Sequence, residues 1–178
     1  MAVLIRTWLG FAALGAGLIH LAVAAGAPSL LLATFAVLGA AEVAWGVAAL
    51  GRRTVPIPRT ALAAATLPTL VWVGLLLAGS PGTHGAAHAA GAHASGAMAA
   101  AAALPLGPML TGTVLDLAVA AVLAIRLRRA RPEVPSPEPG VWAYLGGVFG
   151  GAGVIFALTS AALGATVVGR SAMQAMGH

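Results

Sequence analysis

The chain of 178 residues contains no cysteine and no lysine. The absence of cysteine excludes disulfides, thiolate zinc sites and cysteine nucleophiles, and leaves histidine, methionine and carboxylates as the side chains able to bind a metal. No basic stripe interleaved with aromatic residues occurs, so a nucleic-acid partner is not predicted. Neither a GxSxG nor an HExxH motif is found, so an enzyme is not the favoured class of protein.

Charged side chains are also scarce. Only 7% of the residues are charged, 60% are hydrophobic, and the mean hydropathy is +0.99. A soluble domain carries about 25% charged residues, so this chain has too little charge to cover a surface in water. The composition predicts an all-α polytopic membrane protein with the lipid bilayer as its main partner, because a backbone crossing lipid must pair its polar groups internally. The predicted location is a bacterial-type inner membrane.

Apolar segments long enough to cross a bilayer recur along the chain. A spanning helix needs about 20 residues, because each residue rises 1.5 Å through a hydrocarbon layer roughly 30 Å thick. Five stretches meet this requirement, and glycine, proline or arginine closes each of them. We therefore predict one membrane domain, residues 1–178, with a small bundle of five transmembrane helices at about 5–25, 29–50, 60–79, 109–127 and 141–168.

The arginines are distributed unequally between the two sides of this layout. Only Arg170 falls on one side, and arginine predominates on cytoplasmic loops of membrane proteins. The N-terminus is therefore predicted to be cytoplasmic and the C-terminus extracytoplasmic, with loop 80–108 outside and the proline-rich loop 128–140 inside. The arginines of the predicted inner side are Arg6, Arg52, Arg53, Arg59, Arg126, Arg128, Arg129 and Arg131.

Histidines and methionines gather on the predicted outer side. Residues 83–98 read THGAAHAAGAHASGAM, in which the first two histidines are four residues apart and would share one face of a helix. The tail adds two methionines three residues apart, and thioethers suit Cu(I). The sequence thus predicts that the protein binds or handles a transition metal, copper being favoured, through His84, His88, His93, Met98, Met173, Met176 and His178.

A simpler interpretation of the outer loop exists. Alanine, glycine and histidine all have GC-rich codons, so an unselected loop in a GC-rich genome could gain three histidines. The spacing also lacks the fixed pattern of a zinc finger or an HExxH helix. The loop histidines are diagnostic of a metal site only if they converge.

Three acidic or histidine side chains lie inside predicted spans: His20, Glu42 and Asp116. An aspartate at a helix centre costs about 2.5 to 3.5 kcal/mol, so partners or a water-filled cavity are expected. Counted from the span centres, His20 and Asp116 lie at similar depths in the membrane. Glu42 lies nearer the inner half and is expected to meet Thr66, Thr69 or an arginine. A static hydrogen bond between His20 and Asp116 is the first interpretation; a proton or ion path and a metal site are the alternatives.

The fifth span carries overlapping GxxxG pairs, which favour close packing of helices in lipid. Packing within the chain is the simpler interpretation, and a homo-oligomer or a membrane-protein partner is the other. A non-catalytic accessory or scaffold subunit is therefore the second functional hypothesis, and a proton-coupled carrier using His20, Glu42 and Asp116 is the third. The glycines concerned are Gly146, Gly147, Gly150 and Gly151.

Overall fold

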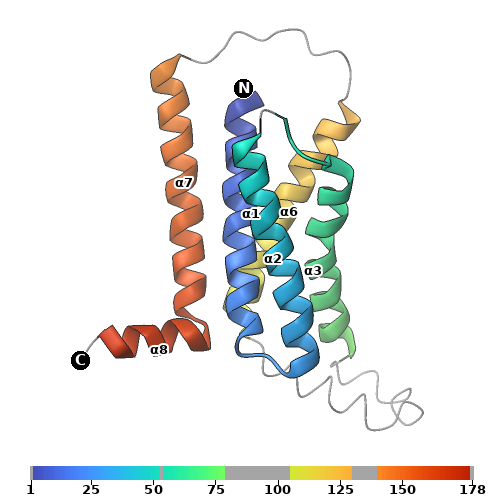
Figure 1. Cartoon of the computed structure of the whole chain (residues 1–178), viewed down its shortest axis with the longest axis vertical. Helices are drawn as coiled ribbons and strands as arrows, with labels where there is room; N and C mark the ends of the chain where they lie inside the picture. The colour runs from blue at the N-terminus through green and yellow to red at the C-terminus, as the bar shows by residue number, and fades with distance from the viewer. Residues whose placement is uncertain (1, 53, 79–104, 130–139, 177–178) are drawn as a thin grey trace.

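The computed structural model describes residues 2–52, 54–78, 105–129 and 140–176. These residues form six helices and no strand, so the all-α prediction is confirmed for this part of the chain. Five long helices lie side by side, and a short one lies across the end of α7 (Figure 1). The helices are α1 (Ala2–Ala24), α2 (Ser29–Gly51), α3 (Pro58–Ala78), α6 (Leu106–Arg128), α7 (Val141–Gly164) and α8 (Val167–Met176).

Four of the helices are long and apolar enough to cross a membrane: α1, α2, α6 and α7. They indicate a multi-pass membrane protein. The remaining predicted span also forms a helix, α3, of 21 residues that include Pro68. Its crossing of the bilayer stays a prediction.

Helix α1 is central to the bundle and contacts α2, α6 and α7, whereas α3 packs mainly against α6. The N-terminus, the α2–α3 connection and the start of α7 lie at one end of the bundle (Figure 1). The α1–α2 turn and α8 lie at the other end. Successive long helices therefore run in alternating directions.

The contact between α1 and α2 brings backbone against backbone. A Cβ atom built on Gly17 would lie 2.7 Å from the carbonyl oxygen of Gly39, and one built on Gly39 would lie 2.7 Å from that of Gly17. Gly10 and Gly46 face each other in the same way, with corresponding distances of 3.2 and 2.9 Å. Small residues permit such close approach in lipid, where packing takes the place of the hydrophobic effect. These two glycine pairs fix the register of the antiparallel helices.

The glycines of α7 divide between two environments. A Cβ atom on Gly147 would meet the side chain of Leu4, and one on Gly151 would overlap the indole of Trp8. Trp8 also donates a hydrogen bond from Nε1 to the carbonyl oxygen of Gly147, at 3.0 Å. By contrast, no described atom lies within 4 Å of a Cβ on Gly146 or Gly150. Half of the predicted strip therefore packs within the molecule.

The predicted segment 141–168 is wrong as a single helix. Helix α7 ends at Gly164, and α8 begins at Val167 after a bend. Thr166 caps the new helix, because its Oγ1 accepts a hydrogen bond from the Gly169 N–H at 3.1 Å. The cap satisfies a backbone donor that the interrupted helix would otherwise leave unpaired, so the chain can turn across the end of the bundle.

Candidate functional site

The three acidic or histidine side chains predicted inside the spans come together in the core of the bundle. His20 of α1 donates from Nδ1 to Oε2 of Glu42 on α2, with 2.8 Å between the two atoms. Its other ring nitrogen, Nε2, lies 3.8 Å from Oδ2 of Asp116 on α6. The exposed fractions of the three side chains are 1%, 8% and 2%. Three helices thus contribute one ionisable group each to a single buried triad.

The His20–Glu42 contact follows from the register of α1 and α2. In the register set by the glycine pairs, Glu42 stands level with Leu14, six residues before His20, which is a separation of about 9 Å along the axis. Side chains on a helix lean toward its N-terminus, and in an antiparallel pair these two lean toward each other. The prediction that Glu42 would meet Thr66 or Thr69 is therefore wrong. Thr66 donates a hydrogen bond to the Ala63 carbonyl oxygen instead.

Two neighbours position the imidazole. The ring of Phe35 on α2 stacks on it, with 5.8 Å between centroids and 22° between planes. Gly112 on α6 leaves room for it, because a Cβ atom there would lie 3.2 Å from His20 Nε2. Gly112 precedes Asp116 by four residues, so both lie on the same face of α6. On that face, Gly112 leaves room for the imidazole and Asp116 places a carboxylate beside it.

Two oxygens of the triad have no hydrogen-bond partner among the described residues: Oε1 of Glu42 and Oδ2 of Asp116. A buried polar atom left unpaired costs about 1–3 kcal/mol, and more when it is charged. With both carboxylates ionised, the triad carries a net charge of −1 if the imidazole is protonated and −2 if it is neutral. In that state, the group offers a negative charge and two unpaired oxygens and could hold a metal ion.

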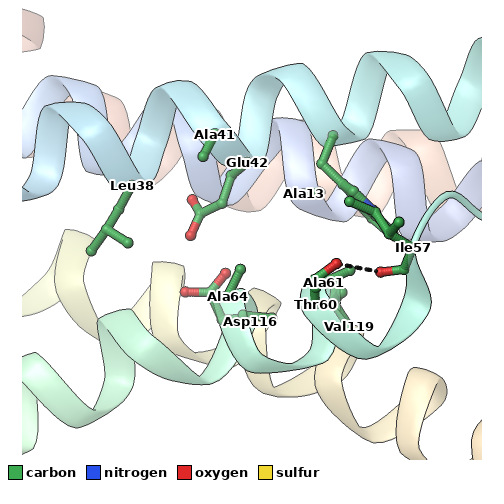
Figure 2. Close-up of a pocket in the computed structure, with 12 residues that line it drawn as sticks. Ala13, Leu38, Ala41, Glu42, Ile57, Thr60, Ala61, Ala64, Asp116 and Val119 are labelled. Carbon is green, nitrogen blue, oxygen red and sulfur yellow. Dashed lines mark hydrogen bonds between the residues drawn. The ribbon is translucent and has the colours of Figure 1, made fainter.

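A cavity of about 190 Å³ adjoins the two carboxylates. It lies between α2, α3 and α6, and Figure 2 shows the carboxylates of Glu42 and Asp116 facing the same space. Ile57 and Thr60, at the start of α3, line its far end, whereas His20 does not line it. Glu42 and Asp116 therefore border the cavity, although both side chains are more than nine-tenths buried.

No known protein family, curated protein or solved structure matches the chain.

The triad is the one group of metal-ligating side chains that the described residues bring together. One potential ligand atom from each of His20, Glu42 and Asp116 lies within 4.8 Å of the other two. The sequence identified these residues but predicted a hydrogen bond between His20 and Asp116. That prediction is wrong, because 3.8 Å separates His20 Nε2 from Asp116 Oδ2 and the imidazole bonds to Glu42 instead. The glycines of α1 and α2, together with the short turn between these helices, could have predicted their register and so the contact of His20 with Glu42.

The predicted outer ligands do not join this site within the described residues. Met173 and Met176 both lie on α8 and are exposed, at the opposite end of α7 from its start. They are three residues apart on this one helix. The other candidates lie outside the described residues, so their convergence stays a prediction: His84, His88, His93, Met98 and His178.

Proposed function

We propose that the protein binds a divalent transition-metal ion inside the membrane at His20, Glu42 and Asp116. The observation that carries the proposal is the 3.8 Å separation of His20 Nε2 and Asp116 Oδ2. Protein ligands bind zinc at about 2.0 to 2.2 Å, so one ion can contact both atoms with little movement of either. Glu42 would hold the other ring nitrogen, as a carboxylate behind a metal-binding histidine commonly does.

The donor set narrows the choice of ion. One imidazole and two carboxylates suit divalent ions such as Zn²⁺, Mn²⁺, Fe²⁺ or Cu²⁺, and no thioether or thiolate is present in the triad to favour Cu(I). Two ionised carboxylates also balance the charge of a divalent ion when the imidazole is neutral. The proposal for copper at the outer histidines and methionines is separate from this site.

Purified protein in lipid nanodiscs, titrated with Co²⁺ as a spectroscopic probe, tests the proposal. We expect ligand-field absorption typical of nitrogen and oxygen donors, and loss of at least about tenfold in affinity for Asp116→Asn and for His20→Gln. Glu42→Gln keeps an acceptor for the imidazole and should weaken binding by about 10 to 100-fold, the range found for groups behind metal ligands.

Matched controls separate the triad from the outer loop. Glu138→Gln removes a carboxylate that lies outside every predicted span and should leave the affinity unchanged. The triple change of His84, His88 and His93 to alanine should also leave it unchanged. Wild-type affinity in Asp116→Asn, or loss of affinity in the triple variant alone, would contradict an intramembrane site.

A proton-coupled carrier is the second candidate function. What favours it is that a carboxylate, an imidazole and a second carboxylate from three helices are neighbours, with 2.8 and 3.8 Å between their nearest polar atoms. An imidazole can accept a proton on one ring nitrogen and release one from the other, so such a group of side chains can pass a proton. Reconstituted vesicles should then show a pH-driven flux that Asp116→Asn removes, and a flux unaffected by this variant would exclude the triad as its path.

We also propose that α3 completes five membrane spans and that the arginine-rich end of the bundle is cytoplasmic. Arg52 and Arg59 flank the α2–α3 connection at the same end as Arg128 and the start of α7, whereas Arg170 lies beyond α7 at the other end. This grouping supports the positive-inside assignment.

A further inference from the structure

The cavity beside the triad presents few unpaired polar atoms. Of its lining residues, Trp45 already donates from Nε1 to the Pro56 carbonyl oxygen at 2.9 Å. Thr60 likewise donates from Oγ1 to the Ile57 carbonyl oxygen at 2.9 Å. The other side chains on the wall, Glu42 and Asp116 apart, are aliphatic. A ligand in this cavity would meet aliphatic and aromatic walls and two carboxylates.

The two carboxylates determine which chemical group of a ligand can bind beside them. Glu42 and Asp116 are each more than nine-tenths buried, and Oε1 of the first and Oδ2 of the second lack a hydrogen-bond partner among the residues described. Ionised carboxylates only accept hydrogen bonds, so the matching group must donate them. An ammonium group has several N–H donors on one atom and can serve two acceptors at once.

The walls and the volume determine the rest of the ligand. Alanines at 41, 61, 64 and 65 leave the space open, and about 190 Å³ exceeds the roughly 150 Å³ of an apolar cavity that binds benzene. Pockets for small molecules combine such apolar walls with a few polar groups that fix orientation. We propose that this cavity binds a small protonated organic amine whose compact apolar body fills the space between α2 and α3.

The proposal rests on the same carboxylates as the proposed metal site and adds a second class of ligand to it. Two carboxylates and a protonated imidazole carry a net charge of −1, which one ammonium group neutralises. The amine and a metal ion should therefore compete for Asp116, although only the amine needs the cavity.

Calorimetric titration of the protein in nanodiscs with benzylamine tests the proposal. Benzyl alcohol, neutral and of similar size, controls for partition into lipid. We expect saturable binding of benzylamine at one site and none of benzyl alcohol, with Co²⁺ displacing the amine. Equal responses to the two compounds, or a benzylamine response that does not saturate, would overturn the proposal.

Variants that fill the cavity separate this inference from the metal site. Ala64→Leu on α3 and Ala41→Leu on α2 should each weaken benzylamine binding at least tenfold, with Co²⁺ binding retained. Ala63→Leu and Ala40→Leu, on neighbouring exposed residues that do not line the cavity, should change neither. Unchanged amine binding in either cavity variant refutes the amine site, whereas absence of Co²⁺ binding in the wild type refutes only the metal proposal.

Discussion

Gly112 is the residue on which the geometry of the triad depends most directly. It lets α6 approach the imidazole of His20 on one side, while Phe35 stacks against the ring. The Nδ1 hydrogen bond to Glu42 then fixes which nitrogen turns toward Asp116. A ring held by three contacts has little freedom, so a small change in its surroundings should alter the site.

Gly112→Ala should disturb the triad without removing any of its members. The added methyl group would lie 3.2 Å from His20 Nε2, so the ring must shift. We expect Co²⁺ affinity to fall several-fold and the free energy of unfolding to fall by about 1 kcal/mol, at the lower end of typical overpacking costs. Thermal unfolding and Co²⁺ titration measure the two effects.

Gly107→Ala on the same helix is the matched control. No described atom lies within 4 Å of a Cβ at this position. Alanine is preferred over glycine in a helix by roughly 0.5–1 kcal/mol, so this variant should be as stable as the wild type or more so. If Gly112→Ala behaves like Gly107→Ala in both measurements, the close packing of Gly112 against the imidazole does not position the ring.

Among the helices, α8 differs from the other five in both length and polarity. It has 10 residues, lies across the end of α7, and is amphipathic. Its polar residues Arg170, Ser171 and Gln174 share one side, while Ala172 and Met176 lie on the other, at 100° per residue. Every residue from Ser171 to Met176 is exposed. A short amphipathic helix whose last six residues are all exposed in the described part of the chain fits the membrane interface.

We predict that α8 lies in the plane of the interface with Ala172 and Met176 toward the acyl chains. The chain has no cysteine, so single cysteines can carry spin labels without background. Labels at positions 172 and 176 should be more accessible to oxygen, and labels at 171 and 174 more accessible to a polar nickel chelate. Accessibility that does not alternate with the helical period would place α8 away from the interface.

The molecule as a whole has an uneven distribution of packing. Helices α1, α2 and α6 enclose the triad, while α7 touches the bundle along a narrow strip and leaves most of its apolar surface uncovered. Trp142, Phe149 and Phe156 of α7 are 86%, 71% and 74% exposed. In a bilayer this surface meets lipid or another membrane protein. It is the part of the molecule that the accessory-subunit hypothesis would use.

The two glycine pairs of α7 should respond differently to the same substitution. Gly151→Leu would displace Trp8 and its hydrogen bond to Gly147, so we expect a loss of about 1 to 3 kcal/mol in unfolding free energy. Gly150→Leu faces open space and should leave stability unchanged.

Light scattering after size-exclusion chromatography measures the oligomeric state of both variants. If the open face binds a second copy, Gly150→Leu should dissociate the oligomer while the monomer stays folded. Equal loss of stability in both variants would contradict the division of the strip into a packed half and an open half.

Composition and apolar segment length were enough to predict a helical, multi-pass membrane protein and the approximate bounds of its long helices. These properties depend on single segments of the chain. Each segment must be long and apolar enough to cross a bilayer, and each must pair its own backbone groups. The scarcity of charge also singled out His20, Glu42 and Asp116, because ionisable groups are costly inside a span wherever they fall.

Which side chains meet depends instead on how the helices pack against one another. The depth of Glu42 along its helix predicted the wrong partners, because depth ignores the rotation of α2, its register against α1 and the lean of the side chains. The same holds for Gly147 and Gly151, which resemble their neighbours in sequence but face Leu4 and Trp8. Such contacts depend on several helices packing at once, and no single segment of the chain contains that information.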